Sequence, residues 1–196
     1  MVGPRFIFII VTLVLSASPV VWAQSYRDTV EFSPMEVYQS ILNFVDRKEY
    51  DKIAGPLKIL SPITSHIAEK FKDNPAVAIN KAIDKGNQEE ILSRVHALIF
   101  LDINDLLDEA SQIVDQSPGT AKAHVNSARL DYEVLSSYVK KKDFAADQKI
   151  KKNFVDSLRA LGSESLYSAE KGTLNTQPIK QRWAEIVSSL SKVFTS

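Results

Sequence analysis

Hydrophobic residues recur every three to four positions along most of the chain, which is the spacing of an α-helix with one buried face. The strongest run lies between residue 88 and about residue 115, where one face carries Leu92, Val95, Ile99, Ile103, Leu106, Ala110 and Ile113. A second clear run near the C-terminal end carries Ile179, Trp183, Ile186, Val187, Leu190 and Val193. No segment shows convincing alternation with the period of two that marks a strand. The pattern therefore predicts an all-α protein.

Local signals predict where several helices begin and end. Ser33, Pro34 and Glu36 form a capping-box pattern at the start of a helix. Gly86 is placed to end a helix in the left-handed conformation, and Asn87 is placed to cap the next one. The prediction is an irregular bundle of about six helices built from helical hairpins.

Two further segments refine this prediction. Pro56 and Pro62 interrupt the segment from Asp51 to Phe71, so short helical pieces are expected there. Asp143 is placed to cap a helix that reaches Leu161. At the corner before that helix, we expect the aromatic ring of Phe144 to fold back onto the preceding helix.

The N-terminal segment has the organisation of a secretory signal peptide. Arg5 precedes an apolar stretch over residues 6–15, and small residues lead to Ala23. A membrane anchor is the rival interpretation, but the apolar core is shorter than the roughly 20 residues needed to cross a bilayer. Cleavage is predicted after Ala23. A single helical domain is then expected over residues 24–196, located in the periplasm or outside the cell, with no transmembrane span.

Composition and charge exclude several classes of function. The 24 basic and 24 acidic side chains give a formal net charge of zero, which argues against a nucleic-acid partner. The chain has no Cys, which excludes disulfides and thiolate chemistry. No phosphate-binding loop, nucleophile elbow or metalloprotease motif is present, so an enzyme is the weaker class. Six lysines gather in one region and favour either a solvated surface or contact with an acidic partner or anionic lipid: Lys140, Lys141, Lys142, Lys149, Lys151 and Lys152.

A few histidines and carboxylates are candidate metal ligands. His66 and Glu69 are three residues apart and so share one helix face, as ligands do in metal-binding bundles. His96 and Asp102 lie on the strongly apolar helix but about 120° apart, so another helix is needed to complete a site. These four residues could hold iron or zinc. The structural alternatives are that His66 and Glu69 form a solvated surface pair and that His96 is a neutral core histidine with a local hydrogen bond. His124 is expected to be exposed.

The short element formed by His66 and Glu69 resembles the His-x-x-Glu element of imelysin-like periplasmic iron proteins. The resemblance covers four residues, and Thr64 and Ser65 stand where that family usually has a Gly before the His. It implies an iron site in a helical periplasmic protein.

Two classes of function follow from these observations. The first is an exported, non-catalytic binding or accessory protein without a cofactor, whose partner could be another envelope protein. The alternative is a periplasmic carrier of a small ligand or of a divalent metal such as iron or zinc, bound by His and carboxylate side chains.

Overall fold

The computed structural model describes residues 32–162 and 175–195. These residues form eight α-helices and no strand, which confirms the predicted all-α class. The helices are α1 (Pro34–Asp46), α2 (Ala54–Ile59), α3 (Ser61–Phe71), α4 (Pro75–Asp84), α5 (Gln88–Ile113), α6 (Pro118–Lys142), α7 (Phe144–Gly162) and α8 (Gln177–Thr195), and a 3-10 turn covers Tyr50–Lys52.

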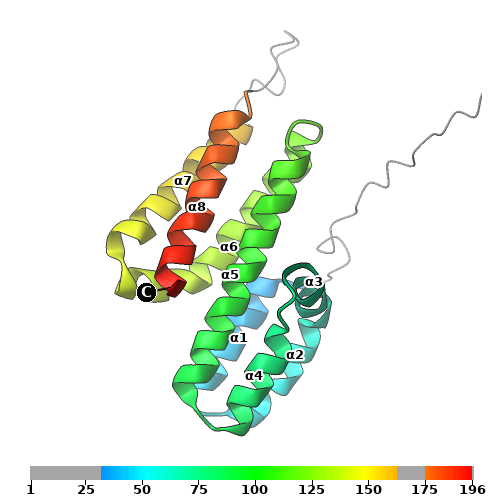
Figure 1. Ribbon diagram of the computed structural model, residues 1–196, viewed down its shortest axis with the longest axis vertical. Coiled ribbons are helices and arrows are strands. Elements are labelled where there is room, and N and C mark those ends of the chain that lie inside the picture. The colour runs from blue at the N-terminus through cyan, green and yellow to red at the C-terminus, as the bar shows by residue number, and fades with distance from the viewer. Residues whose placement is uncertain (1–31, 163–174, 196) are drawn as a thin grey trace, which may run out of the picture.

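Helix α5 is the longest described element, and α1, α3, α4, α6 and α8 pack against it (Figure 1). The most extensive contacts join helices that follow each other in the chain, namely α4 with α5, α5 with α6, α6 with α7 and α7 with α8. Helix α4 leads into the start of α5 in a hairpin, whereas α3 meets the second half of α5 through His66 and Lys70. Helix α7 packs between α6 and α8. The fold is therefore a series of helical hairpins, and it sets α3 against α5.

Two of the predicted helix starts are fixed by side-chain caps. The side-chain oxygen of Asn87 accepts a hydrogen bond from the backbone N–H of Glu90, and Asp143 caps α7 in the same way through the N–H of Ala146. Gly86 has a φ of 62°, as predicted for a left-handed stop. The prediction of a capping box at the start of α1 is wrong, because the side chain of Ser33 makes no capping hydrogen bond. Pro34 still occupies the first turn of that helix.

One hydrophobic cluster runs through the described residues, and all eight α-helices contribute to it. The predicted face of α5 supplies its centre, because Val95, Ile99, Ile103, Leu106 and Ala110 have no exposed surface. Trp183 docks α8 on this cluster and is only 2% exposed. Phe194 adds a stacked contact with Phe100, with ring centroids 5.0 Å apart. The ring of Phe144 does not fold back as predicted: it is 59% exposed, with the Lys140 ammonium 5.8 Å from its centroid.

Three of the six clustered lysines are neutralised within the chain. Lys149 pairs with Glu185, Lys152 pairs with Asp156, and Lys151 donates to the fully buried Asp147. Burial alone raises the pKa of the Asp147 carboxyl, but hydrogen bonds from Lys151, Ser136 and Tyr132 outweigh this and hold its pKa below the usual value. Of the three pairs, only Lys149–Glu185 joins two helices, α7 and α8, while Asp147 also links α7 to α6 by accepting hydrogen bonds from Tyr132 and Ser136.

The predicted signal peptide lies in residues 1–23, outside the described residues. Among the helices that are described, none combines the length and the apolar character needed to cross a bilayer.

Candidate metal site

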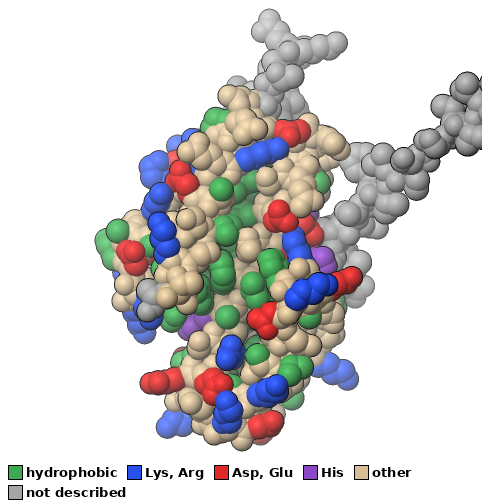
Figure 2. Space-filling view, viewed as in Figure 1, with side chains coloured by type: hydrophobic (Ala, Val, Ile, Leu, Met, Phe, Trp, Pro, Cys, Tyr) green, Lys and Arg blue, Asp and Glu red, His purple; other side chains and the backbone are tan. Residues whose placement is uncertain are grey.

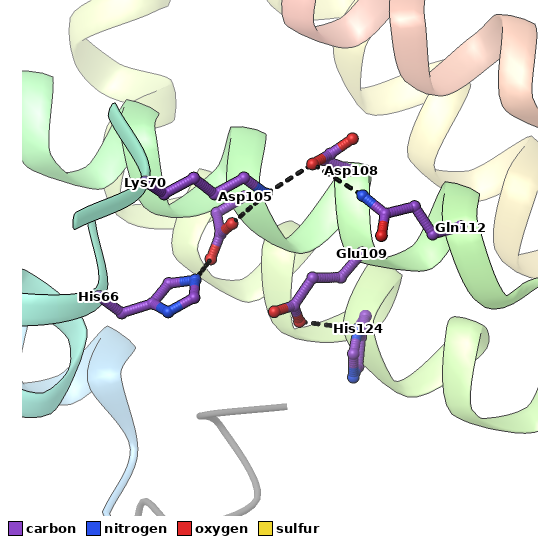
Figure 3. A network of polar contacts seen from close by, with 7 residues as sticks. All are labelled: His66, Lys70, Asp105, Asp108, Glu109, Gln112 and His124. Atoms are coloured by element: carbon purple, nitrogen blue, oxygen red, sulfur yellow. Dashed lines mark hydrogen bonds and ion pairs between the residues drawn. The ribbon is translucent and has the colours of Figure 1, made fainter. Parts of the chain in front are cut away.

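Helices α3 and α5 bring a histidine and several carboxylates together. His66 and Lys70 are four residues apart on α3, so both side chains leave the same face of that helix. Asp105 and Glu109 have the same spacing on α5. Because α3 packs against α5, these two pairs meet side by side, as Figure 3 shows.

The centre of the cluster is the contact between His66 and Asp105. Nε2 of His66 lies 3.1 Å from Oδ2 of Asp105, an ion-pair distance without hydrogen-bond alignment. The Asp105 side chain has no exposed surface, whereas that of His66 is 33% exposed. One potential ligand atom from each of His66, Asp105 and Glu109 can be chosen so that all three lie within 4.8 Å of one another. The cluster is thus anchored on a buried carboxylate.

Lys70 supplies the nearest positive charge. Its Nζ donates hydrogen bonds to Oδ1 of Asp105 at 2.6 Å and to Oδ2 of Asp108 at 2.5 Å. Gln112 donates to the same oxygen of Asp108 at 3.1 Å. Burial acts to lower the pKa of the Lys70 ammonium, but the hydrogen bonds and charges of Asp105 and Asp108 outweigh it and raise the pKa. Lys70 therefore carries a full positive charge at neutral pH.

Helix α6 closes the cluster on the side of Glu109. Nδ1 of His124 lies 3.3 Å from Oε2 of Glu109, and Figure 3 shows Glu109 between the two histidines. The prediction that His124 is exposed is wrong, since its residue exposure is 6%. Its helix turns this ring inward beside the buried Ala121, Val125 and Ala128.

The cluster has donors and charge suited to a divalent cation of the first transition row. Such ions accept imidazole nitrogen and carboxylate oxygen together, at about 2.0–2.2 Å for zinc. Ligand atoms at those bond lengths stand roughly 3–3.5 Å apart, so the three ligand atoms, which lie within 4.8 Å of one another, would move closer together on binding an ion. Asp105, Asp108 and Glu109 with Lys70 give a formal charge of −2 when both imidazoles are neutral, which a divalent ion would balance.

The four residues predicted as ligands are not brought together. Among the described residues, the only group of three metal-binding side chains is His66, Asp105 and Glu109. Of the predicted set, Glu69 is exposed on α3. Asp102 is fully buried and accepts a hydrogen bond from the hydroxyl of Tyr38 at 2.5 Å. His96 lies two and a half turns before Asp105 on α5, so of the predicted ligands only His66 joins the cluster.

His96 belongs to a separate pocket of about 370 Å³ between α1, α5 and α6. Its ring packs on that of Tyr138 with centroids 4.3 Å apart. Burial lowers the pKa of His96 to about 4, Lys141 acts in the same direction, and Asp46 opposes it. The prediction of a neutral ring is therefore supported. Nδ1 does not make the predicted local hydrogen bond, because it is buried and has no hydrogen-bond partner among the described residues.

The lowered pKa of His96 predicts acid sensitivity. Between pH 6.5 and about 4, the unfolded chain takes up a proton at His96 and the folded chain does not, so acidification favours unfolding. The contribution is complete above pH 6.5 and declines as the pH falls toward 4, by about 3 kcal/mol in total. Urea unfolding across this range should show a smaller decline for His96→Gln than for the wild type. Equal declines in both proteins would contradict this assignment.

The missed residues carried a signal in the sequence. Asp105 and Glu109 stand one turn apart on the flank of a strongly apolar helix, and this spacing places two carboxylates on one face. Their partner His66 lies 39 positions before Asp105, and the spacing within α5 cannot reveal which helix crosses it there.

Comparisons with protein-family models, with curated proteins and with solved structures found no match to this chain. The function proposed below therefore rests on the residues of the site.

Proposed function

We propose that the protein is an exported, non-catalytic binding protein whose ligand is a divalent metal ion held by His66, Asp105 and Glu109. The observation that carries this proposal is the convergence of one imidazole and two carboxylates within 4.8 Å, from two helices. Lys70 and His124 contact the two carboxylates from outside the triad. Outer contacts of this kind orient metal-binding carboxylates and tune their affinity.

Iron or zinc fits this donor set better than calcium or magnesium, because both accept an imidazole nitrogen. Three protein ligands leave at least one coordination position for water or an exchanging ligand. The partly exposed ring of His66 gives the ion a route to solvent. An open site of this kind suits a carrier that loads and releases its ion. The partner that this role implies is another envelope protein able to accept the metal.

Metal-dependent thermal stability tests the proposal. A ligand that binds only the folded chain at about 100 times its Kd adds about 2.7 kcal/mol of stability. For a chain of this size that corresponds to roughly 5–10 °C in Tm. Zinc added to the purified, metal-stripped protein should raise the Tm by this amount, and a chelator should reverse it. His66→Ala, which should bind zinc about 100-fold more weakly, should shift by no more than about 1–2 °C at the same zinc concentration. A shift of the same size in His66→Ala would place the metal elsewhere on the chain.

Export rests on the N-terminal segment and has its own test. If Ala23 ends a signal peptide, the protein recovered from outside the cytoplasm begins at Gln24. N-terminal sequencing of that material should read Gln-Ser-Tyr-Arg-Asp. Material that retains Met1 and fractionates with the membrane would instead support the anchor interpretation.

A further inference from the structure

The ammonium of Lys70 and the ring of His66 contact different oxygens of the Asp105 carboxylate. Nζ holds Oδ1 of Asp105 at 2.6 Å and is itself held by Asp108 at 2.5 Å, so it is tied between two carboxylates of α5. The Asp105 side chain is fully buried, and hydrogen bonds in such surroundings are stronger than in water. Oδ2, the atom 3.1 Å from His66, remains directed at the site (Figure 3).

We infer that Lys70 is a specificity-determining residue: by occupying Oδ1 of Asp105 it restricts this carboxylate to one metal bond, so the site selects zinc-like transition metals over calcium. The inference rests on the proposed function, because it concerns the same three ligands. It adds the chemical class of ion that the site accepts and names the side chain that sets this selection.

The coordination preferences of the two ions give the physical reason. Zinc is satisfied by about four ligands and bonds well to imidazole. Calcium takes about six to eight oxygen ligands, and bidentate carboxylates are a common way to supply them. With Oδ1 engaged by Lys70, Asp105 offers a single oxygen, and His66 offers a nitrogen that calcium binds poorly. The cluster therefore lacks the oxygen donors that calcium requires.

The test compares zinc and calcium affinities of the purified protein with those of Lys70→Gln. The wild type should bind zinc at least about 100-fold more tightly than calcium, and Lys70→Gln should lower this ratio by about tenfold or more, since Oδ1 becomes available. Loss of the Lys70 positive charge strengthens the binding of both ions, so this effect largely cancels in the ratio of zinc to calcium affinity. A change in that ratio therefore reports on the oxygens of Asp105. Lys149→Gln is the matched control, because it removes an interhelical lysine–glutamate pair between α7 and α8. Its ratio should equal that of the wild type.

Cobalt binding provides a second measurement. Its wild-type spectrum tests the inference even if Lys70→Gln does not fold. Co²⁺ bound to the wild type should give the intense visible absorption of a four- or five-coordinate ion, and Lys70→Gln should weaken this absorption by raising the coordination number. A six-coordinate spectrum in the wild type, or an unchanged ratio in a folded Lys70→Gln, overturns the inference and leaves the proposed function standing. A wild type that binds neither zinc nor cobalt overturns the proposed function itself.

Discussion

The Trp183→Ala variant is expected to lose about 3–5 kcal/mol of unfolding free energy, which is the usual cost of removing a large buried aromatic side chain. Trp183 is only 2% exposed and lies where α8 packs on the hydrophobic cluster. Its removal would leave a cavity that the surrounding helices can fill only in part. Chemical denaturation with an unchanged m-value would measure the loss.

Two further variants of α8 and its tryptophan sharpen this prediction. The indole Nε1 is buried without a hydrogen-bond partner among the described residues, so Trp183→Phe removes no hydrogen bond and should cost less than Trp183→Ala. Lys192→Ala, on the exposed side of the same helix, should change stability by less than about 0.5 kcal/mol. A Trp183→Ala protein as stable as Lys192→Ala would mean that α8 is not docked as described.

Loss of a metal ligand is the second large effect. Replacing His66 with Ala or Glu109 with Gln should weaken zinc binding about 100-fold each, because structural zinc sites gain roughly 3 kcal/mol per ligand. Competition with a chromophoric chelator would measure the dissociation constants. Because Glu109 contacts His124 as well, Glu109→Gln also removes the charge that holds that ring.

The matched controls come from the same two helices. His96→Gln alters a histidine of α5 that lies outside the cluster, and Glu69→Gln alters an exposed carboxylate of α3. Both variants should bind zinc as the wild type does. If Glu69→Gln lost zinc while Glu109→Gln kept it, the ligand set first predicted from the His66–Glu69 spacing would replace the triad.

Local signals were sufficient to predict most of the fold. Asn87 and Asp143 cap their helices because the capping hydrogen bond joins residues only three apart. The buried face of α5 could be predicted from the helical spacing of its apolar residues, because these residues form a continuous apolar stripe along one side of the helix. The predictions for Ser33 and Phe144 were wrong because each residue has an alternative arrangement. At the start of α1, backbone contacts take the place of a side-chain cap by Ser33. At the start of α7, the ring of Phe144 stays exposed and contacts a lysine ammonium.

The site was harder to predict, because it depends on contacts distant in sequence. His66 was recognised as a candidate, but its partner Asp105 belongs to a helix that begins 22 residues later. Spacing within one helix pairs His66 with Glu69, whereas the crossing of α3 over α5 pairs it with Asp105. Similarly, the inward position of His124 follows from how α6 packs on α5. Those crossings arise from the packing of complete helical faces, which no local pattern specifies.

The most direct test of the metal-binding proposal is equilibrium dialysis of the purified protein against zinc, followed by elemental analysis of the protein compartment. At a free zinc concentration about ten times the wild-type Kd, we predict about 0.9 ions per chain for the wild type and about 0.1 for His66→Ala. A wild type that retains no more zinc than His66→Ala would contradict the proposed function.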